Sequence, residues 1–205
     1  MLKFDLLEGI DSIEHGITEK GEDAPNDILI ANQVHKDTAI WIDTPDQDPG
    51  SVDAMVTRKQ GITLGVRTAD CVPLLFVDEG KGIVGVIHAG WRGTALEITR
   101  KTMEFLQFSP HTLKVGIGPA IGPESFEVGE EVAKQFSASV VTQSATEEGK
   151  FHVDLWQANF EQLVEVGVSQ RNIEVLRLDT YTEENLYSFR AGDRDNRNIA
   201  WIRLK

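Results

Sequence analysis

The stretch from Ile62 to Thr94 limits the possible folds of this chain more than any other. Two short apolar runs, 74–77 and 83–87, are separated by five residues that include two glycines and three charged residues. Such runs predict two β-strands joined by a turn, which is an antiparallel hairpin. Cys71 enters the first strand and His88 leaves the second. Antiparallel pairing therefore places the only thiol of the chain close to an imidazole.

A helix is predicted directly after this hairpin. The chain continues from His88 as Ala-Gly-Trp-Arg-Gly-Thr, and apolar residues then recur at helical spacing: Leu96, Ile98, Met103, Phe105 and Leu106. A helix that starts at this glycine-rich turn presents backbone N–H groups and Arg92 beside the imidazole, which attracts anions and favours a thiolate. Cys71 or His88 taken alone fits a buried core position better than a site. The coincidence of thiol, imidazole and helix start favours a function.

Length and charge restrict the other possibilities. The 205 residues suffice for one sizeable core, and no Pro/Gly/Ser-rich linker divides them, so we expect one domain over 1–205. A net charge of −13 argues against nucleic acid or an anionic membrane as an extended partner. We find no signal-peptide pattern and no apolar window of transmembrane length. A single cysteine forms no internal disulfide, so a reducing compartment, the cytoplasm, is expected.

The remaining pattern is rich in strands first and mixed afterwards. Further strands are predicted at 2–7, 10–17, 28–34, 38–42, 52–57, 62–67, 113–117, 173–178 and 199–204, and further helices at 128–136 and 154–166. Without regular β-α-β alternation, this order predicts an α+β fold with mixed β-sheets in layers. Fingerprints for dinucleotide binding, Walker A phosphate binding and the Gly-x-Ser-x-Gly elbow are all missing from the chain.

His35, Cys71 and His88 support two chemistries equally well. Two imidazoles and a thiolate make a catalytic zinc set with one open position, and the same donors also suit copper. A multicopper site needs more histidines than the five of this chain provide. Without a metal, Cys71 beside a histidine can act as a nucleophile, as in cysteine hydrolases. The spacing in the sequence does not separate the two.

Several blocks of the chain resemble the YfiH-like laccase-domain family, also described as multicopper polyphenol oxidoreductases and purine nucleoside phosphorylases. The blocks are Gln33-Val34-His35, Arg67-Thr68-Ala69-Asp70-Cys71-Val72-Pro73, Val86 to Thr94, Gly116 to Pro123, Glu127-Val128-Gly129, Val153-Asp154-Leu155 and Tyr187-Ser188-Phe189-Arg190. They cover most of the chain, and the Ala-Asp-Cys and His-Ala-Gly-Trp-Arg-Gly blocks are specific.

The resemblance implies a fold, a metal and a reaction. The fold is an α/β/β/α sandwich, usually monomeric, with one metal, most often zinc, on His35, Cys71 and His88. The reactions are phosphorolysis of adenosine, inosine and methylthioadenosine, and deamination of adenosine. Nucleoside and phosphate are then the small-molecule partners. Cys71, His88 and Arg92 are the implied catalytic residues, with Arg92 also binding phosphate.

Two departures from the family pattern concern charge. Lys20 stands where the family has an arginine, and the final Arg-Arg pair is reduced to Arg190-Ala191. We expect Lys20 and Arg190 to bind substrate or phosphate, although a lysine cannot reproduce the bidentate binding of an arginine. Two other functions stay open: a copper-dependent polyphenol oxidase, and a weakly active member that works as a cysteine hydrolase or edits a cell-wall precursor.

Overall fold

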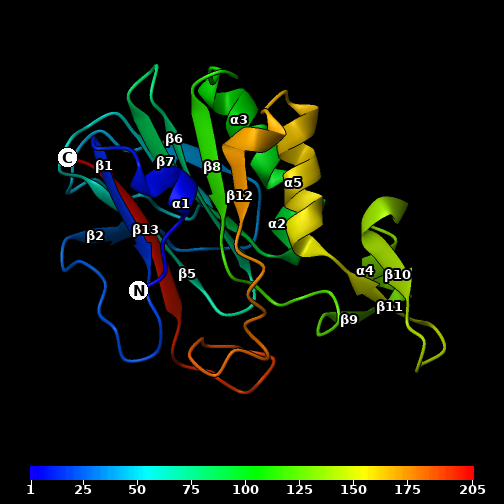
Figure 1. Cartoon of the computed structure of the whole chain (residues 1–205). Helices are drawn as coiled ribbons and strands as arrows, with labels where there is room; N and C mark the ends of the chain where they lie inside the picture. The colour runs from blue at the N-terminus through cyan, green and yellow to red at the C-terminus, as the bar shows by residue number, and fades with distance from the viewer.

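Two β-sheets packed face to face form the body of the protein (Figure 1). The computed structural model describes all residues, Met1–Lys205. The larger sheet has the order β12-β8-β6-β7-β4-β3 and the smaller one the order β1-β13-β5-β2. Parallel pairs occur at β3–β4, β8–β12 and β2–β5, and the other neighbours are antiparallel. Both sheets are therefore mixed, which confirms the predicted α+β class.

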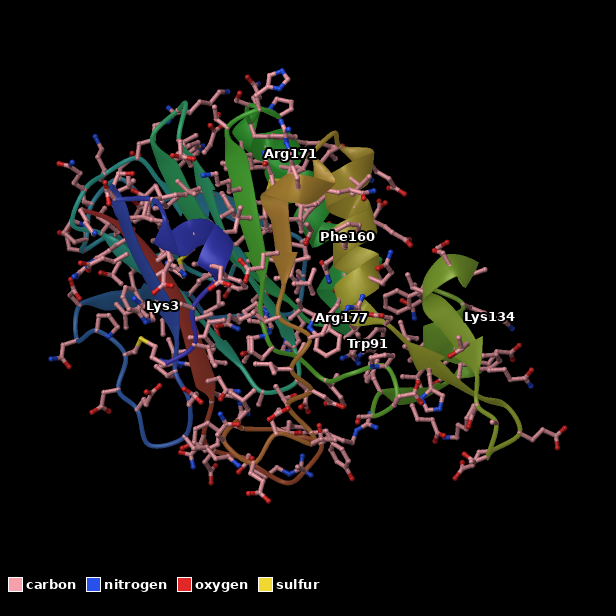
Figure 2. The ribbon with its side chains drawn as sticks, in the orientation of Figure 1. Lys3, Trp91, Lys134, Phe160, Arg171 and Arg177 are labelled. Atoms are coloured by element: carbon pink, nitrogen blue, oxygen red, sulfur yellow. The ribbon has the colours of Figure 1, made fainter.

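The strands of these sheets are short. The bounds are β1 Ile13–Ile17, β2 Ile28–Ile30, β3 Ala39–Trp41, β4 Ala54–Thr57, β5 Thr63–Thr68, β6 Val72–Asp78, β7 Ile83–Ala89, β8 Leu113–Ile117, β12 Ile173–Val175 and β13 Asn198–Leu204. A third sheet has the order β10-β11-β9. Its strands are β9 Glu127–Gly129, β10 Val141–Gln143 and β11 Lys150–Val153. This sheet projects from the body together with the short helix α4 (Glu130–Ala133), which is followed by Lys134, labelled in Figure 2.

The predicted hairpin is confirmed as β6–β7, and both of its faces are buried. Leu74 and Phe76 belong to the core under the helices, whereas Leu75 and Val77 belong to the core between the two sheets. Successive side chains of a strand point to opposite faces, so burial on both sides requires an unbroken apolar run. Each such side chain stabilises the fold by about 1.5–3 kcal/mol. The pairing register places Pro73 opposite His88.

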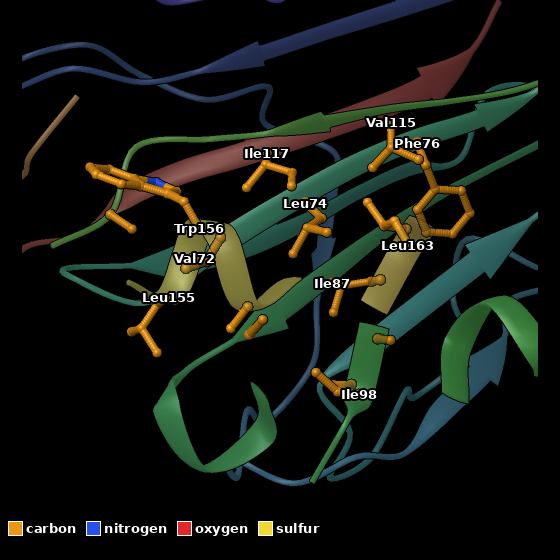
Figure 3. Close-up of a cluster of buried hydrophobic side chains, with 14 of the residues drawn as sticks. Val72, Leu74, Phe76, Ile87, Ile98, Val115, Ile117, Leu155, Trp156 and Leu163 are labelled. Atoms are coloured by element: carbon orange, nitrogen blue, oxygen red, sulfur yellow. The ribbon is translucent and has the colours of Figure 1, made fainter. Parts of the chain in front are cut away.

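Three helices, α2 (Trp91–Ala95), α3 (Ile98–Leu106) and α5 (Leu155–Glu165), cover the outer face of the larger sheet. Figure 3 shows side chains of α3 and α5, such as Ile98 and Leu163, facing Leu74 and Ile87 of the sheet. Helix α5 starts as predicted, because the side chain of Asp154 accepts a hydrogen bond from the N–H of Gln157. None of the helices has the length and apolarity that a membrane crossing requires.

The helix predicted after His88 is in fact two helices. Glu97 adopts a left-handed conformation (φ 63°) between α2 and α3, and this changes the phase of the second helix. Leu96 and Phe105, both predicted on the buried face, are exposed. Polar side chains of α5 stabilise the break: Gln162 donates to the carbonyl of Thr94, at the end of α2.

Two further predictions were wrong. Positions 5–7, predicted as the end of a strand over 2–7, belong to the single turn α1 (Asp5–Glu8), which is anchored by buried Phe4 and Leu7. The helix predicted at 128–136 begins as strand β9, in which Val128 pairs with Phe151, and only Glu130–Ala133 is α-helical. In both segments tertiary pairing and packing override a weak local periodicity.

His15 gives the fold a calculable dependence on pH. Its ring is buried and accepts a hydrogen bond from the N–H of Phe4, and burial lowers the pKa of His15 to about 4. The unfolded chain takes up this proton near pH 6.5, so the contribution of His15 to stability is present above that pH and is lost as the pH falls towards 4. The expected loss is about 2 kcal/mol, less than the full shift would give, because solvent at the edge of the core screens the charge.

Denaturant unfolding at pH 7 and pH 4 measures this loss. His15→Gln provides the matched control, because glutamine can accept a hydrogen bond but does not titrate. The wild type is expected to lose about 2 kcal/mol more than the variant over this range. Equal losses in the two proteins would contradict a neutral buried His15.

Candidate metal centre

Three side chains from separate parts of the chain converge at one end of the β6–β7 hairpin. His35 lies in the loop between β2 and β3 with a positive φ of 58°, Cys71 directly precedes β6, and His88 lies on β7. Their possible ligand atoms all lie within 4.8 Å of one another, and Cys71 Sγ is 3.9 Å from His35 Nε2. The two imidazole rings meet edge to face at a centroid distance of 4.8 Å. The sequence predicted this set, although 36 positions separate His35 from Cys71.

Asp53, at the start of β4, holds two of these residues in place. Its Oδ1 accepts a hydrogen bond from His88 Nδ1 at 2.8 Å and one from the N–H of His35 at 3.0 Å. Its Oδ2 accepts from the N–H groups of Lys36 and Val34. One buried carboxylate thus orients the ring of one histidine and the loop that carries the other. Carboxylates commonly play this role behind metal-binding histidines.

Asp53 was not among the site residues predicted from the sequence. A signal for it was present, because Asp53 is an acidic residue beside a short apolar run, Ala54–Val56, in a segment predicted to be a strand. Charged residues are rarely buried unless they are paired. A buried carboxylate at a strand start therefore points to a partner that carries hydrogen-bond donors.

The electrostatics of the cluster favour a thiolate. Burial by itself raises the pKa of Cys71, but hydrogen bonds and charge from His35 and His88 outweigh it and bring the pKa below its usual value. Burial by itself lowers the pKa of His88, but Asp53 and Cys71 outweigh it and raise that pKa. Burial by itself raises the pKa of Asp53, but the hydrogen bond and charge of His88 and the backbone N–H groups of Lys36 and His35 together outweigh it, so the pKa is lowered. A thiolate is the form of cysteine that binds metals and attacks electrophiles.

The donor set fits a zinc ion. Zinc bound to one sulfur at about 2.3 Å and to nitrogens at about 2.0–2.1 Å places tetrahedral N and S donors roughly 3.6 Å apart. The distance between Cys71 Sγ and His35 Nε2, 3.9 Å, is close to this value. Three protein donors leave a fourth position for water or substrate. The remaining histidines lie elsewhere: His15 contacts Phe4, His152 bonds to Pro123, and His111 belongs to no metal-ligand group.

Gly90 is required by the close approach of the chain to these ligands. A Cβ atom at this position would lie 2.9 Å from His35 Cδ2 and 3.0 Å from Cys71 Sγ. Both distances are shorter than ordinary van der Waals contact. The backbone conformation of Gly90, with φ −66° and ψ 166°, suits any residue. Glycine is therefore needed because a side chain would clash with His35 and Cys71, and not because of the backbone conformation.

Gly90→Ala is expected to weaken zinc binding, because the methyl group displaces His35 or Cys71 from the shared position. Overpacking of this kind costs about 1–3 kcal/mol, which corresponds to about a 5- to 150-fold loss of affinity. Competition for zinc with a chelating dye measures the change. Gly9→Ala is the matched control, since a Cβ at Gly9 meets nothing within 4 Å and the φ there is also negative. Equal zinc affinities of the two variants would show that the site tolerates the methyl group.

The three residues lie on the wall of a cavity of about 750 Å³. Volumes of this size are typical of small-molecule sites. The wall combines aromatic, cationic and acidic side chains with the metal ligands, and its other members are Ala31, Asn32, Gln33, Arg67, Ala69, Asp70, Trp91, Arg92, Ile121, Phe126, Phe189, Arg190, Asp195 and Arg197. Trp91, labelled in Figure 2, begins α2.

The cationic residues predicted to bind phosphate differ in their placement. Arg92 and Arg190 line the cavity. Lys20 does not belong to the lining and instead pairs with Asp193 at 3.6 Å and stacks over the ring of Tyr187. Its phosphate-binding role stays a prediction. Helix α2 is only about one and a half turns long, so its dipole contributes little positive potential. Arg92 is therefore the main cationic group that this segment brings to the cavity.

Asp70 connects the Cys71 loop to the segments that carry Thr180 and Arg190. It adopts a positive φ of 84°, which is rare for a residue other than glycine. Its carboxylate accepts hydrogen bonds from the hydroxyl of Thr180 at 2.8 Å and from the N–H of Arg190 at 2.7 Å. These hydrogen bonds support the unusual backbone conformation of the residue directly before the thiol. Unusual backbone conformations of this kind are concentrated at functional sites.

Comparisons with known proteins find relatives along nearly the whole chain. A family model described as multi-copper polyphenol oxidoreductase laccase matches residues 15–205. A purine nucleoside phosphorylase from Bacteroides thetaiotaomicron is 34% identical over 97% of this chain and 77% of its own length. Adenosine deaminase RL5, from an unknown prokaryotic organism, is 43% identical over 66% of this chain and only 55% of its own length.

A solved structure extends the comparison to three dimensions. The crystal structure of YlmD from Geobacillus stearothermophilus superimposes with a TM-score of 0.84 at 25% identity, covering 95% of this chain and 93% of that chain. The family model and this structure span nearly the whole sequence and confirm the resemblance found in its motifs. The chain belongs to the multi-copper polyphenol oxidoreductase laccase family.

Proposed function

We propose that this protein is a zinc-dependent purine nucleoside phosphorylase that also deaminates adenosine. The observation that carries the proposal is the convergence of His35, Cys71 and His88 within 4.8 Å on the wall of a cavity large enough for a nucleoside. The names of its relatives, purine nucleoside phosphorylase and adenosine deaminase, support the same two reactions. Nucleoside and phosphate are the partners that this proposal requires.

The residues of the chain prepare the site for a metal. Asp53 accepts the bond from His88 Nδ1, so a metal that displaces the proton from Nε2 would bind that nitrogen. Cys71, held as a thiolate, supplies the negative charge that keeps a divalent cation in place. A bound zinc ion supplies Lewis acidity and lowers the pKa of water.

The cavity wall suits the other parts of a nucleoside. Trp91, Phe126 and Phe189 offer aromatic surface for a purine ring. In phosphorolysis, phosphate attacks the anomeric carbon of the ribose while the bond to the base breaks, giving free base and ribose 1-phosphate. The guanidinium group of Arg92 is placed to hold that phosphate, because guanidinium donors match the oxygens of phosphate in pairs. In deamination, water replaces the amino group of adenosine, and ammonia leaves.

Product analysis tests this proposal. Zinc-loaded protein supplied with adenosine and phosphate is expected to give adenine and ribose 1-phosphate, at a rate that rises with phosphate concentration and then saturates. Without phosphate it is expected to give inosine. Chelation should stop both reactions. If neither product forms at high enzyme concentration with zinc and phosphate present, the proposed function is wrong.

Two other functions have an observation in their favour. The family description names a polyphenol oxidoreductase, and copper suits the same three donors. A phenol oxidase would consume oxygen and require copper. The second is a cysteine hydrolase, because Asp53, His88 and Cys71 form a carboxylate, imidazole and thiol series. A hydrolase of this kind would keep its activity after chelation.

A further inference from the structure

The cavity wall is more cationic than the chain as a whole. The chain carries a net charge of −13, yet four arginines and only two aspartates line the cavity. One of these aspartates, Asp70, already uses both carboxylate oxygens to accept bonds from Thr180 and Arg190. A concave wall with an excess of arginine attracts anions even when the whole protein is acidic.

Two of the four arginines hold the protein together. Arg190 donates to the carbonyl of Ser125 at 3.1 Å and to that of Glu127 at 3.5 Å. Arg197 donates through Nη1 to backbone carbonyls of its own loop, at 2.6 Å for Asn196 and 2.9 Å for Arg194. These two guanidinium groups hold loop backbone in place, so part of their hydrogen-bonding capacity is used within the protein.

The other two, Arg67 and Arg92, have all their guanidinium donors free. Neither side chain forms a hydrogen bond or an ion pair with the protein. The guanidinium carbon of Arg92 lies 4.2 Å from the ring centre of Trp91, so it is stacked on an aromatic face. Stacking orients the guanidinium plane through its face and leaves the N–H groups in the plane unused. Arg92 is thus held in place with its donors available.

Arg67 is tied to the metal-ligand loop by its backbone. The side chain of Gln33 accepts a hydrogen bond from the N–H of Arg67 at 2.8 Å and donates one to the carbonyl of Arg67, also at 2.8 Å. Gln33 lies only two positions before His35. This pair of hydrogen bonds fixes the backbone of Arg67 relative to the loop that carries His35. Arg67 also lines the cavity.

We propose that Arg67 and Arg92 together bind inorganic phosphate in this cavity beside His35, Cys71 and His88. The inference rests on the proposed function, in which phosphate is the second substrate, and it assigns Arg67 to the role that the sequence suggested for Lys20. Lys20 is occupied by Asp193 and Tyr187 outside the cavity lining. Two guanidinium groups can each donate a pair of hydrogen bonds to a tetrahedral anion, which one lysine cannot do.

Calorimetric titration of the zinc-loaded protein with inorganic phosphate, in the absence of nucleoside, tests the pair. Arg67→Gln and Arg92→Gln are each expected to weaken phosphate binding about 10- to 100-fold, because each loses charge-assisted hydrogen bonds. Arg58→Gln is the matched control and is expected to bind phosphate as the wild type does, whereas Lys20→Gln tests the competing assignment. Arg58 stacks on Trp41 and is outside the cavity lining. Zinc content and thermal unfolding confirm that each variant is folded and loaded.

The outcomes separate this inference from the proposed function. Unchanged phosphate affinity in Arg67→Gln, or a loss in Lys20→Gln as large as that in Arg67→Gln, would overturn the assignment. Adenosine 5′-monophosphate is the second probe. If only this nucleotide depends on the two arginines, they hold the phosphate of a larger ligand and the assignment to inorganic phosphate is wrong. Phosphate binding through the pair without any nucleoside turnover would uphold the inference and defeat the proposed function.

Discussion

Cys71→Ala is expected to lose its zinc and its nucleoside turnover together. The thiolate is the only negatively charged donor among the three ligands, and without it two neutral imidazoles must retain a divalent cation. The loss of zinc affinity should exceed about 100-fold, the upper range for losing a group that merely supports a ligand. Elemental analysis of the purified variant and an adenosine assay measure the two effects.

His111→Ala is a suitable control for Cys71→Ala. His111 is exposed, is outside the cavity lining and belongs to no metal-ligand group. This variant should keep both zinc and turnover. If the Cys71→Ala protein retained one zinc per chain, Cys71 would not be a zinc ligand. A protein that lost turnover but kept zinc would favour the nucleophilic role of the thiol.

Asp53→Asn is expected to have the second largest effect, and it acts without contacting the metal. The carboxylate accepts bonds from the ring of His88 and from three backbone N–H groups, and an amide has an NH₂ group where one of those acceptors was. Zinc affinity should fall about 10- to 100-fold. The free energy of unfolding should fall by about 1–3 kcal/mol, since at least one buried donor is left without an acceptor.

Asp78→Asn separates these two effects. Asp78 is also fully buried and also accepts bonds from a loop, namely from the N–H of Ser109 and the hydroxyl of Thr112. It lies at the far end of β6 from Cys71. This variant should lose a similar amount of stability and bind zinc like the wild type. Equal zinc affinities in Asp53→Asn and Asp78→Asn would show that Asp53 stabilises the fold but does not position the metal ligands.

The core of the fold and the metal triad could be predicted for clear physical reasons. Strands β6 and β7 are buried on both faces, so their sequences are unbroken apolar runs with a polar turn between them. Antiparallel pairing then places Cys71 beside His88 without further information. His35 was added by its donor chemistry and by the family resemblance, because its loop position allows no such geometric argument.

The parts that were not predicted depend on contacts between distant segments. The sheet of β9, β10 and β11 has strands of three or four residues, too short for a periodic pattern. The break at Glu97 depends on polar side chains of α5, about 60 positions further on, as in the bond from Gln162 to Thr94. Asp53 and Arg67 become significant only when the partners of each polar group are known. Sequence periodicity contains none of this information.

The zinc content of the wild-type protein, purified without added metal, tests the central claim most directly. We expect one zinc per chain, and none in a variant with alanine at His35, Cys71 and His88. Elemental analysis of the two proteins side by side gives both values in one experiment. Copper in place of zinc at one ion per chain, or zinc retained in full by the triple variant, would contradict the proposed metal centre.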